Sequence, residues 1–318
     1  RKMRKFVTLL LAVAVLAAVG CAGSSRSEDG VTRIAYIVKA MTDEFWIDMK
    51  KGAEEYAAAN GIELSFQSPE KETDVERQIQ MVENALVSKA DAIILSAADS
   101  QALIPAIVRA NEAGVPVILV NDTIEPEALE TYGGHVATYV GIDQYAAAKL
   151  AGEDAVARHP EGGNVVLLEG IAGVSALQQR LDGFKDQVAA NPKFKIVASQ
   201  TANNDRHQAF NVMQNILQSN PDVDVVWAIN AEMGQGAVQA IQQSGTTRRI
   251  AVYDFDASSD DIAAIRAGTL VGSVAQYPKL QAEGAINAAL DAMAGKNLPA
   301  HTVTKAELIT AANVDTLE

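Results

Sequence analysis

The chain has 318 residues, 40 acidic and 26 basic side chains, a formal net charge of −14 and a single cysteine. A chain this acidic is a poor partner for nucleic acid or for an anionic bilayer, so no nucleic acid is expected as a ligand. One cysteine cannot form an internal disulfide or a cysteine cluster for zinc. The four histidines show no metal-ligand spacing, so neither a metal nor a cofactor is expected.

Residues 1–20 have the pattern of a signal peptide. The basic side chains of Arg1, Lys2, Arg4 and Lys5 precede an apolar run over residues 6–19, which is shorter than the roughly 18 to 20 residues that span a bilayer. The segment 16–21 resembles a bacterial lipobox, so Cys21 is predicted to carry lipid, and the small and polar residues 21–31 form a spacer. An uncleaved transmembrane anchor is the alternative.

The following segment alternates short apolar runs with amphipathic patterns, which is typical of βαβ units around a parallel sheet. Phe45, Met49 and Ala53, for example, fall on one face of a helix. Strands are predicted over 32–38, 62–67, 92–96 and 116–120, and helices over 45–60, 74–88 and 102–113.

The second half of the chain repeats the first at one constant offset, which superposes Gly52 on Gly183 and Gly114 on Gly245. Its strands are predicted over 164–168, 195–199, 225–229 and 250–253, and its helices over 178–190, 206–219 and 236–243. The repeat predicts an α/β fold of two similar doubly wound parallel-sheet lobes, each with its own core. The functional surface is expected between the lobes.

Polar residues follow the predicted strands, and ligands of doubly wound sheets bind outside the carboxyl ends of the strands. Carboxylates and amides pair well with vicinal hydroxyls, and Phe45 and Trp46 add flat apolar faces, so a sugar or polyol is predicted as the ligand. Any single member of the set could instead be a helix cap or turn residue. The members are Lys39, Asp43, Asp99, Asn121, Asp122, Asn203, Asn204, Asp205, Asn230, Asp254 and Asp256.

No catalytic motif is present. The chain lacks a Walker loop and a G-x-S-x-G elbow, and Gln239 stands where a dinucleotide fingerprint beginning at Gly234 needs its third glycine. No nucleophile is accompanied by a base. The sequence therefore predicts a binding protein and not an enzyme.

Several stretches resemble the periplasmic sugar-binding proteins of ABC transporters, in particular the ribose-binding branch with the type I periplasmic binding protein fold. They are IAYIVKAMTDEFWIDMKKGAE at 34–54, VPVILVND at 115–122, GIAGVSALQQRLDGF at 170–184, ASQTANNDRHQAFNVMQN at 198–215, AINAEMGQGA at 228–237 and VAQYP at 274–278. The resemblance implies a monomer that captures a monosaccharide, a pentose or hexose, or a polyol and delivers it to a membrane permease and its ATPase. It also implies export to the periplasm or cell surface.

The same resemblance implies a set of ligand-binding residues. Phe45 and Trp46 correspond to the aromatic pair that stacks on the sugar, and Arg180, Asn230, Asp256 and Gln276 match the family's polar contacts. Other contact positions carry different residues from those of ribose binders, namely Lys39, Asp43, Asn121, Asp122 and Asn204. The mixture of carboxylates with an arginine favours a neutral ligand. A lysine after the first strand also resembles receptors for autoinducer-2, so a signal or chemotaxis receptor is the alternative.

The resemblance further implies a three-segment hinge, with crossings near Ile142, Gln276 and Lys305. The N-terminal lobe is then 32–142 plus 277–304, and the C-terminal lobe is 143–276 plus 305–318. Sensor domains of LacI-type transcription factors share this architecture, but they need an N-terminal helix-turn-helix where this chain has the signal-peptide pattern.

Overall fold

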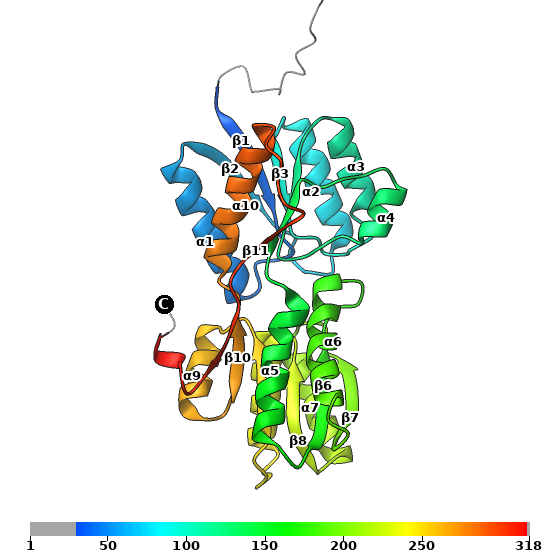
Figure 1. Cartoon of the computed structure of the whole chain (residues 1–318), viewed down its shortest axis with the longest axis vertical. Helices are drawn as coiled ribbons and strands as arrows, with labels where there is room; N and C mark the ends of the chain where they lie inside the picture. Colours follow the sequence, from blue (N-terminus) through cyan, green and yellow to red (C-terminus); the bar gives the residue numbers. More distant parts are fainter. Residues whose placement is uncertain (1–29, 317–318) are drawn as a thin grey trace, which may run out of the picture.

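The computed structural model describes residues 30–316, which form two α/β lobes joined end to end (Figure 1). The predicted signal peptide, the lipidation site Cys21 and most of the predicted spacer lie outside the described residues. Within residues 30–316, no helix is both long and apolar enough to cross a membrane.

The first lobe contains a six-stranded parallel sheet in the order β11-β5-β4-β3-β1-β2. β1 pairs with both β2 and β3, so the strand order reverses at this point, which is where doubly wound sheets bind ligands. The strands are β1 (Thr32–Ile37), β2 (Ile62–Gln67), β3 (Ala92–Leu95), β4 (Val117–Val120), β5 (Thr138–Gly141) and β11 (His301–Val303).

The second lobe repeats this arrangement in the order β12-β10-β9-β8-β6-β7. Its strands are β6 (Gly163–Glu169), β7 (Phe194–Thr201), β8 (Val223–Ala228), β9 (Ala251–Phe255), β10 (Gly272–Ala275) and β12 (Glu307–Thr310). The edge strand β12, which the sequence analysis did not predict, runs antiparallel to β10. The two doubly wound lobes are otherwise confirmed.

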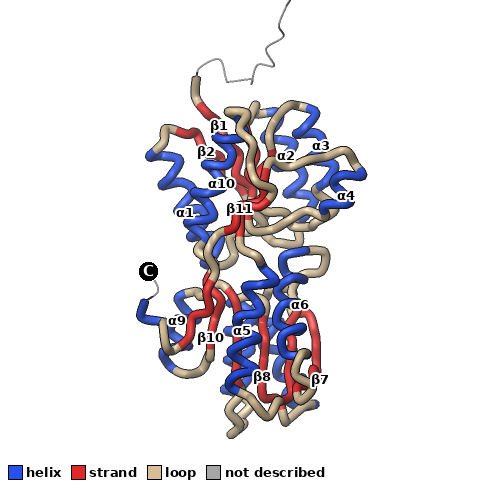
Figure 2. The backbone as a smooth tube through the Cα atoms, viewed as in Figure 1, coloured by secondary structure: helices blue, strands red, loops and turns tan. Residues whose placement is uncertain are grey.

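Helices cover both faces of each sheet (Figures 1 and 2). The first lobe holds α1 (Glu44–Ala59), α2 (Val75–Val87), α3 (Ile104–Glu112), α4 (Pro126–Thr131) and α10 (Pro278–Met293). The second holds α5 (Gln144–Arg158), α6 (Ser175–Ala189), α7 (Arg206–Ser219), α8 (Ala231–Gln243), α9 (Ser259–Ala267) and the 3₁₀ turn η1 (Val314–Thr316).

Gly52 and Gly183, which coincide in the repeat, each allow two helices to pack closely. A Cβ on Gly52 of α1 would lie 2.9 Å from the Cα of Lys279 in α10, and a Cβ on Gly183 of α6 would collide with the Tyr145 carbonyl in α5. Only glycine permits this close approach of two helices. The repeat in the sequence therefore reflects a repeated helix pair.

Each lobe has its own apolar core. In the first lobe the sheet separates two clusters, one under α2 and α3 and the other under α1 and α10. In the second lobe Phe184 and Trp227 stack with ring centroids 4.7 Å apart, and Tyr253 packs against the same pair. Such aromatic pairs add about 0.5–1.5 kcal/mol beyond the burial of their area.

Three chain segments cross between the lobes, from β5 to α5, from β10 to α10 and from β11 to β12 (Figure 2). Ile142 and Tyr277, which the sequence placed in the first lobe, have side chains that pack against the second core. Tyr277 takes a φ of +51°, which is unfavourable for a side chain of this size. The crossing after β10 is therefore locally strained.

Candidate functional site

Residues that follow strands of both sheets line one cavity between the lobes, so the carboxyl ends of the two sheets face each other. The cavity volume is about 290 Å³, but the centre of a water molecule can occupy only about 20 Å³ of it. The lining residues are Lys39, Asp43, Phe45, Trp46, Glu72, Asn121, Leu177, Arg180, Asn204, Asn230, Asp256 and Gln276. Of the predicted ligand-binding residues, only Asp122 does not line the cavity, and Glu72 and Leu177 were missed.

Two of these residues are helix caps as well as cavity residues. The Asp43 carboxylate accepts a hydrogen bond from the backbone N–H of Trp46 at 3.2 Å, and the Asn230 side chain accepts one from Met233 at 3.0 Å. Asn230 also explains why α8 begins at Ala231 and not at the predicted residue 236. The cap fixes each side chain at the edge of the cavity.

Lys39 is held by Asp122 beneath the cavity. The ammonium lies 3.1 Å from one carboxylate oxygen and 3.2 Å from the other, and Ser96 donates to the first of these oxygens at 2.6 Å. Burial lowers the pKa of Lys39, but the charges of Asp122 and Glu72 outweigh it, so the net shift is upward. Lys39 therefore remains charged and is already paired.

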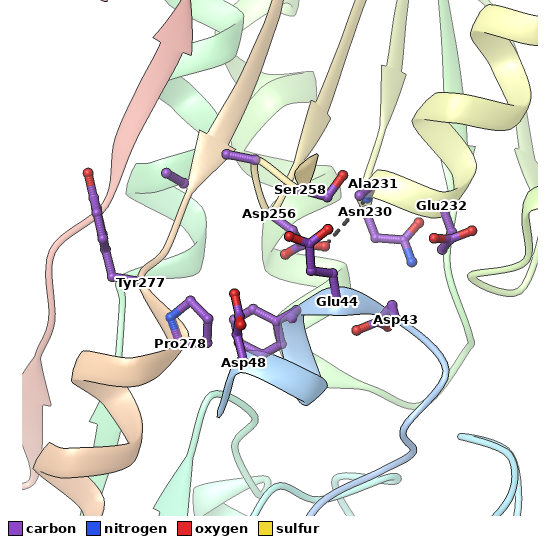
Figure 3. A pocket seen from close by; sticks show the side chains of 13 residues that line it. Asp43, Glu44, Asp48, Asn230, Ala231, Glu232, Asp256, Ser258, Tyr277 and Pro278 are labelled. Atoms are coloured by element: carbon purple, nitrogen blue, oxygen red, sulfur yellow. Dashed lines mark hydrogen bonds between the residues drawn. The ribbon is translucent and has the colours of Figure 1, made fainter. Parts of the chain in front are cut away.

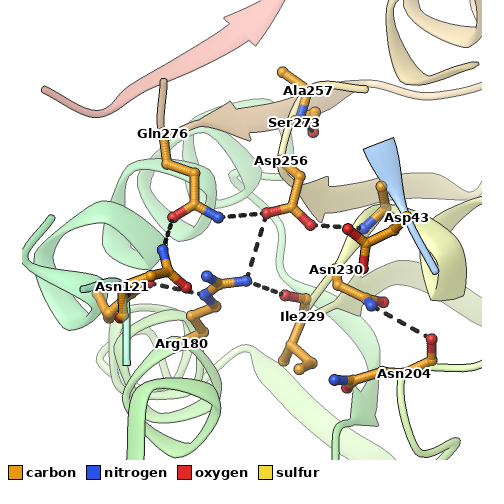
Figure 4. A network of polar contacts seen from close by, with 12 residues as sticks. Asp43, Asn121, Arg180, Asn204, Ile229, Asn230, Asp256, Ala257, Ser273 and Gln276 are labelled. Carbon is orange, nitrogen blue, oxygen red and sulfur yellow. Dashed lines mark hydrogen bonds and ion pairs between the residues drawn. The ribbon is translucent and has the colours of Figure 1, made fainter. Parts of the chain in front are cut away.

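Arg180 is fixed in the same way from the second lobe (Figure 4). Its guanidinium donates to Gln144 at 2.8 Å and to the Ile229 carbonyl at 3.1 Å, and it lies 3.9 Å from the ring centre of Phe255. Its ion pair with Asp256 measures 3.6 Å. These contacts fix the orientation of the guanidinium, so this group is preorganised.

Asp256 connects Arg180 to the hinge. It accepts hydrogen bonds from Gln276 at 2.5 Å and from the backbone N–H of Ala231 at 3.4 Å. Burial raises the pKa of Asp256 although Arg180 opposes the shift. Gln276 in turn accepts from Asn121 at 2.7 Å, so a polar network runs from the cavity into the crossing segment after β10.

Glu72 enters the cavity from the loop after β2. It accepts hydrogen bonds from the Trp46 indole at 3.2 Å and from Asn204, across the cleft, at 2.6 Å. Trp46 meets Phe45 edge to face at 82°, and both rings are buried in the first core while they line the cavity. The two rings therefore pack in the first core and line the cavity at the same time.

Among the carboxyl groups of the cavity wall, Asp43 has the largest shift in pKa. Burial, followed by the charges of Glu72 and Asp256, raises the pKa of the Asp43 carboxyl to about 8. The opposing contributions of the Trp46 N–H and of Lys39 are smaller. The Asp43 carboxyl is therefore mostly protonated at pH 7.

The two lobes touch at both rims of the cavity. On one side Glu44 accepts from the Ser259 N–H at 3.0 Å and from its hydroxyl at 2.6 Å. On the other side the Ser100 N–H donates to the Gly173 carbonyl at 2.9 Å, and Ser175 donates to Ser100 at 2.9 Å. Asp99 lies on this second rim and not in the cavity. The conformation is closed.

Residues 34–297 match the periplasmic binding protein domain. The chain belongs to this family. It is 33% identical over 276 residues to the ribose import binding protein RbsB of Escherichia coli, which covers 87% of this chain and 88% of that protein. The relatives are binding proteins of transport systems, so this periplasmic binding protein is not an enzyme.

Solved structures of ABC transporter binding proteins share the whole two-lobe fold. A solute-binding protein of Actinobacillus succinogenes with bound D-allose superposes with a TM-score of 0.86 at 34% identity, over 90% of this chain and 100% of that one. The Caulobacter myo-inositol binding protein, bound to myo-inositol, gives a TM-score of 0.82 at 31% identity, over 90% and 95% of the two chains. The type I fold inferred from the sequence is confirmed.

Proposed function

We propose that this periplasmic binding protein is exported, is anchored through a lipid on Cys21, and captures a monosaccharide or polyol between its lobes for delivery to an ABC permease and its ATPase. The observation that carries the proposal is the cavity itself. It brings hydrogen-bonding side chains of both lobes around an aromatic pair at the ends of both sheets. Relatives named for ribose, allose and myo-inositol support the ligand class.

Closure is the means by which the site would bind. In the closed form the polar side chains bond to one another and leave room for little more than one water molecule. A sugar would therefore enter while the lobes are apart and would replace bonds such as that between Glu72 and Asn204. Because the ligand contacts both lobes only after closure, it shifts the population toward the closed form.

Isothermal titration with a panel of pentoses, hexoses, polyols and autoinducer-2 tests the proposal. We expect micromolar or tighter binding of at least one monosaccharide or polyol, with contraction in small-angle scattering. Tight binding of amino acids or peptides alone would contradict it. Tightest binding of autoinducer-2 would favour the receptor alternative.

Anchoring needs a separate experiment. The Cys21→Ser variant should leave the membrane fraction, because one thiol is the only place for the lipid, and its ligand affinity should equal that of the wild type. Continued membrane retention of the variant would mean that the apolar segment 6–19 is itself the anchor.

A further inference from the structure

We propose that the ligand carries a positive charge, as a monosaccharide or polyol with a protonated amine. This inference rests on the proposed function and narrows its substrate class. It also replaces the neutral ligand that the sequence favoured, because the sequence could not show which charges of the cavity are already paired.

The two basic side chains of the cavity are each paired with a carboxylate. Lys39 is paired with Asp122 at 3.1 Å, and Arg180 is paired with Asp256 at 3.6 Å and bonded to Gln144. Each pair is formally neutral. The cavity therefore offers no free cation that would discriminate against a positively charged ligand.

Two carboxylates remain without a cation. Among the described residues, no Lys or Arg forms a salt bridge with Asp43 or Glu72. Glu72 accepts two hydrogen bonds from neutral donors and Asp43 accepts one, whereas a carboxylate has about four acceptor sites. Both groups can therefore accept further hydrogen bonds, and an ammonium supplies three donors.

A third acceptor points the same way. The buried side-chain oxygen of Asn204 has no hydrogen-bond partner in the described part of the chain, while its amide nitrogen bonds Glu72. A buried acceptor without a partner costs about 1–3 kcal/mol, so a ligand that brings donors to this place gains more than one that brings acceptors.

Both rims of the cleft are acidic. The rim in Figure 3 is lined by five acidic residues and no basic one, namely Asp43, Glu44, Asp48, Glu232 and Asp256. The opposite rim carries Asp99, Glu125 and Glu169, again without a basic lining residue. A cleft lined by one sign of charge concentrates ligands of the opposite sign and repels those of the same sign.

These charges select among amines. An amino acid would bring a carboxylate beside Glu72, where like charges repel, and no unpaired guanidinium or ammonium is present in the cavity to receive it. A polyol with one amine has no such group, and its hydroxyls suit Asn230, Asp256 and Gln276. The geometry thus favours an amine on a polyhydroxylated skeleton.

The test is a calorimetric comparison of matched pairs at pH 7 across pentose, hexose and acyclic skeletons. Each pair contains a neutral sugar or alditol and its amino-deoxy counterpart, with the N-acetylated amine as a control for size. We expect at least one amine to bind about tenfold or more tightly than both its neutral and its acetylated partner. If the tightest ligand of the panel is neutral, the charge inference is wrong and the proposed function stands. If no member of any pair binds, the proposed function itself fails.

Two variants test whether the charge of Glu72 causes the preference for an amine. Glu72→Gln keeps the size of the side chain but removes its charge and one of its two acceptor oxygens, so it should reduce the affinity for the amine by a larger factor than that for the neutral partner. Glu70→Gln, exposed in the same loop, should change neither. An equal loss for both ligands in Glu72→Gln would contradict a role for the charge, and an unchanged melting temperature shows that folding is intact.

Discussion

The two walls of the cavity differ in how their charges are held. On the second-lobe wall, Arg180 and Asp256 are paired and tied to backbone groups of Ile229 and Ala231. On the first-lobe wall, Glu72 and Asp43 lack cations, and the rings of Phe45 and Trp46 lie beside them. The comparison indicates that the second wall anchors any ligand of the proposed class, whereas the first wall distinguishes one ligand from another.

The largest expected effect is on the anchoring wall. Arg180→Ala removes a charged donor at the cavity wall and the cation that holds Asp256, and a hydrogen bond to a charged group contributes about 1.5–3 kcal/mol. Affinity for every ligand of the panel should fall about 10- to 100-fold in titration calorimetry. Arg158→Ala, which removes an exposed ion pair with Asp154, is the control and should bind normally. If Arg180→Ala bound the ligands with wild-type affinity, the second-lobe wall would not anchor them.

The aromatic part of the first wall should have a smaller effect. Trp46→Ala removes a stacking surface and also the indole donor to Glu72. We expect about a tenfold loss of affinity, and a different loss for different sugars because stacking depends on the apolar face of each one. Ile47→Ala changes the exposed neighbour on the same helix and should have no effect. If Trp46→Ala reduced the affinity for every sugar by the same factor, the first wall would not distinguish one ligand from another.

The acidity of Asp43 gives a pH test of the same wall. With a pKa of about 8, this carboxyl is mostly protonated at pH 7, and a bound ammonium would lower that pKa and release the proton. The affinity for an amino-alditol whose amine titrates well above pH 8 should therefore rise as pH increases toward about 8 and then level off. The neighbours that set the shift are Glu72, Asp256 and Lys39.

Asp43→Asn checks this assignment. The variant should lose the pH dependence while it keeps the cap of α1, because asparagine also caps helices well. Titrations in buffers with different ionisation heats measure the released proton directly. A pH dependence that persists in the variant would assign the proton to another group.

A buried acid behind the second wall should have the smallest effect, on stability alone. Within residues 30–316 neither carboxyl oxygen of Asp254 has a hydrogen-bond partner, and only a glycine at position 234 leaves room for them. Burial, reinforced by Asp261, raises the pKa of Asp254 well above its usual range. The native state therefore favours the protonated form, so the stability contributed by this group is complete below the unfolded pKa near 3.9 and is lost as pH rises through the folded value.

Asp254→Asn should accordingly raise the melting temperature at pH 8, by roughly 2–4 °C for about 1 kcal/mol, and less at pH 5. Thermal unfolding followed by circular dichroism at the two pH values measures the difference. Glu55→Gln on the surface of α1 is the control. An equal change at both pH values would show that packing and not charge is responsible.

Sequence patterns predicted the fold well because periodicity and the repeat depend on local burial. Helix starts were less certain, since α8 begins at its Asn230 cap, within a stretch whose apolar residues continue the preceding strand. The antiparallel edge strand β12 escaped prediction because three crossings between lobes leave no local pattern. Strand direction at a sheet edge is decided by the path of the chain.

Some residues of the candidate site could likewise be predicted from the sequence, and others could not. Residues directly after strands were found because the ends of parallel strands converge, and the resemblance supplied Arg180 from within a helix. Glu72 was missed because it lies several residues after β2 in a polar loop that resembles an ordinary connection. Pairing was also beyond the sequence, because Lys39 and Asp122 are far apart in the chain and meet only in the fold.

The most direct test is a crystal structure of the protein with its tightest-binding ligand from the matched panel. We expect a closed molecule with the sugar or polyol skeleton against Phe45 and Trp46, hydroxyls bonded to Asp256 and Asn230, and an amine within hydrogen-bond distance of Glu72. A ligand bound outside the cavity between the lobes would show that this cavity is not the binding site.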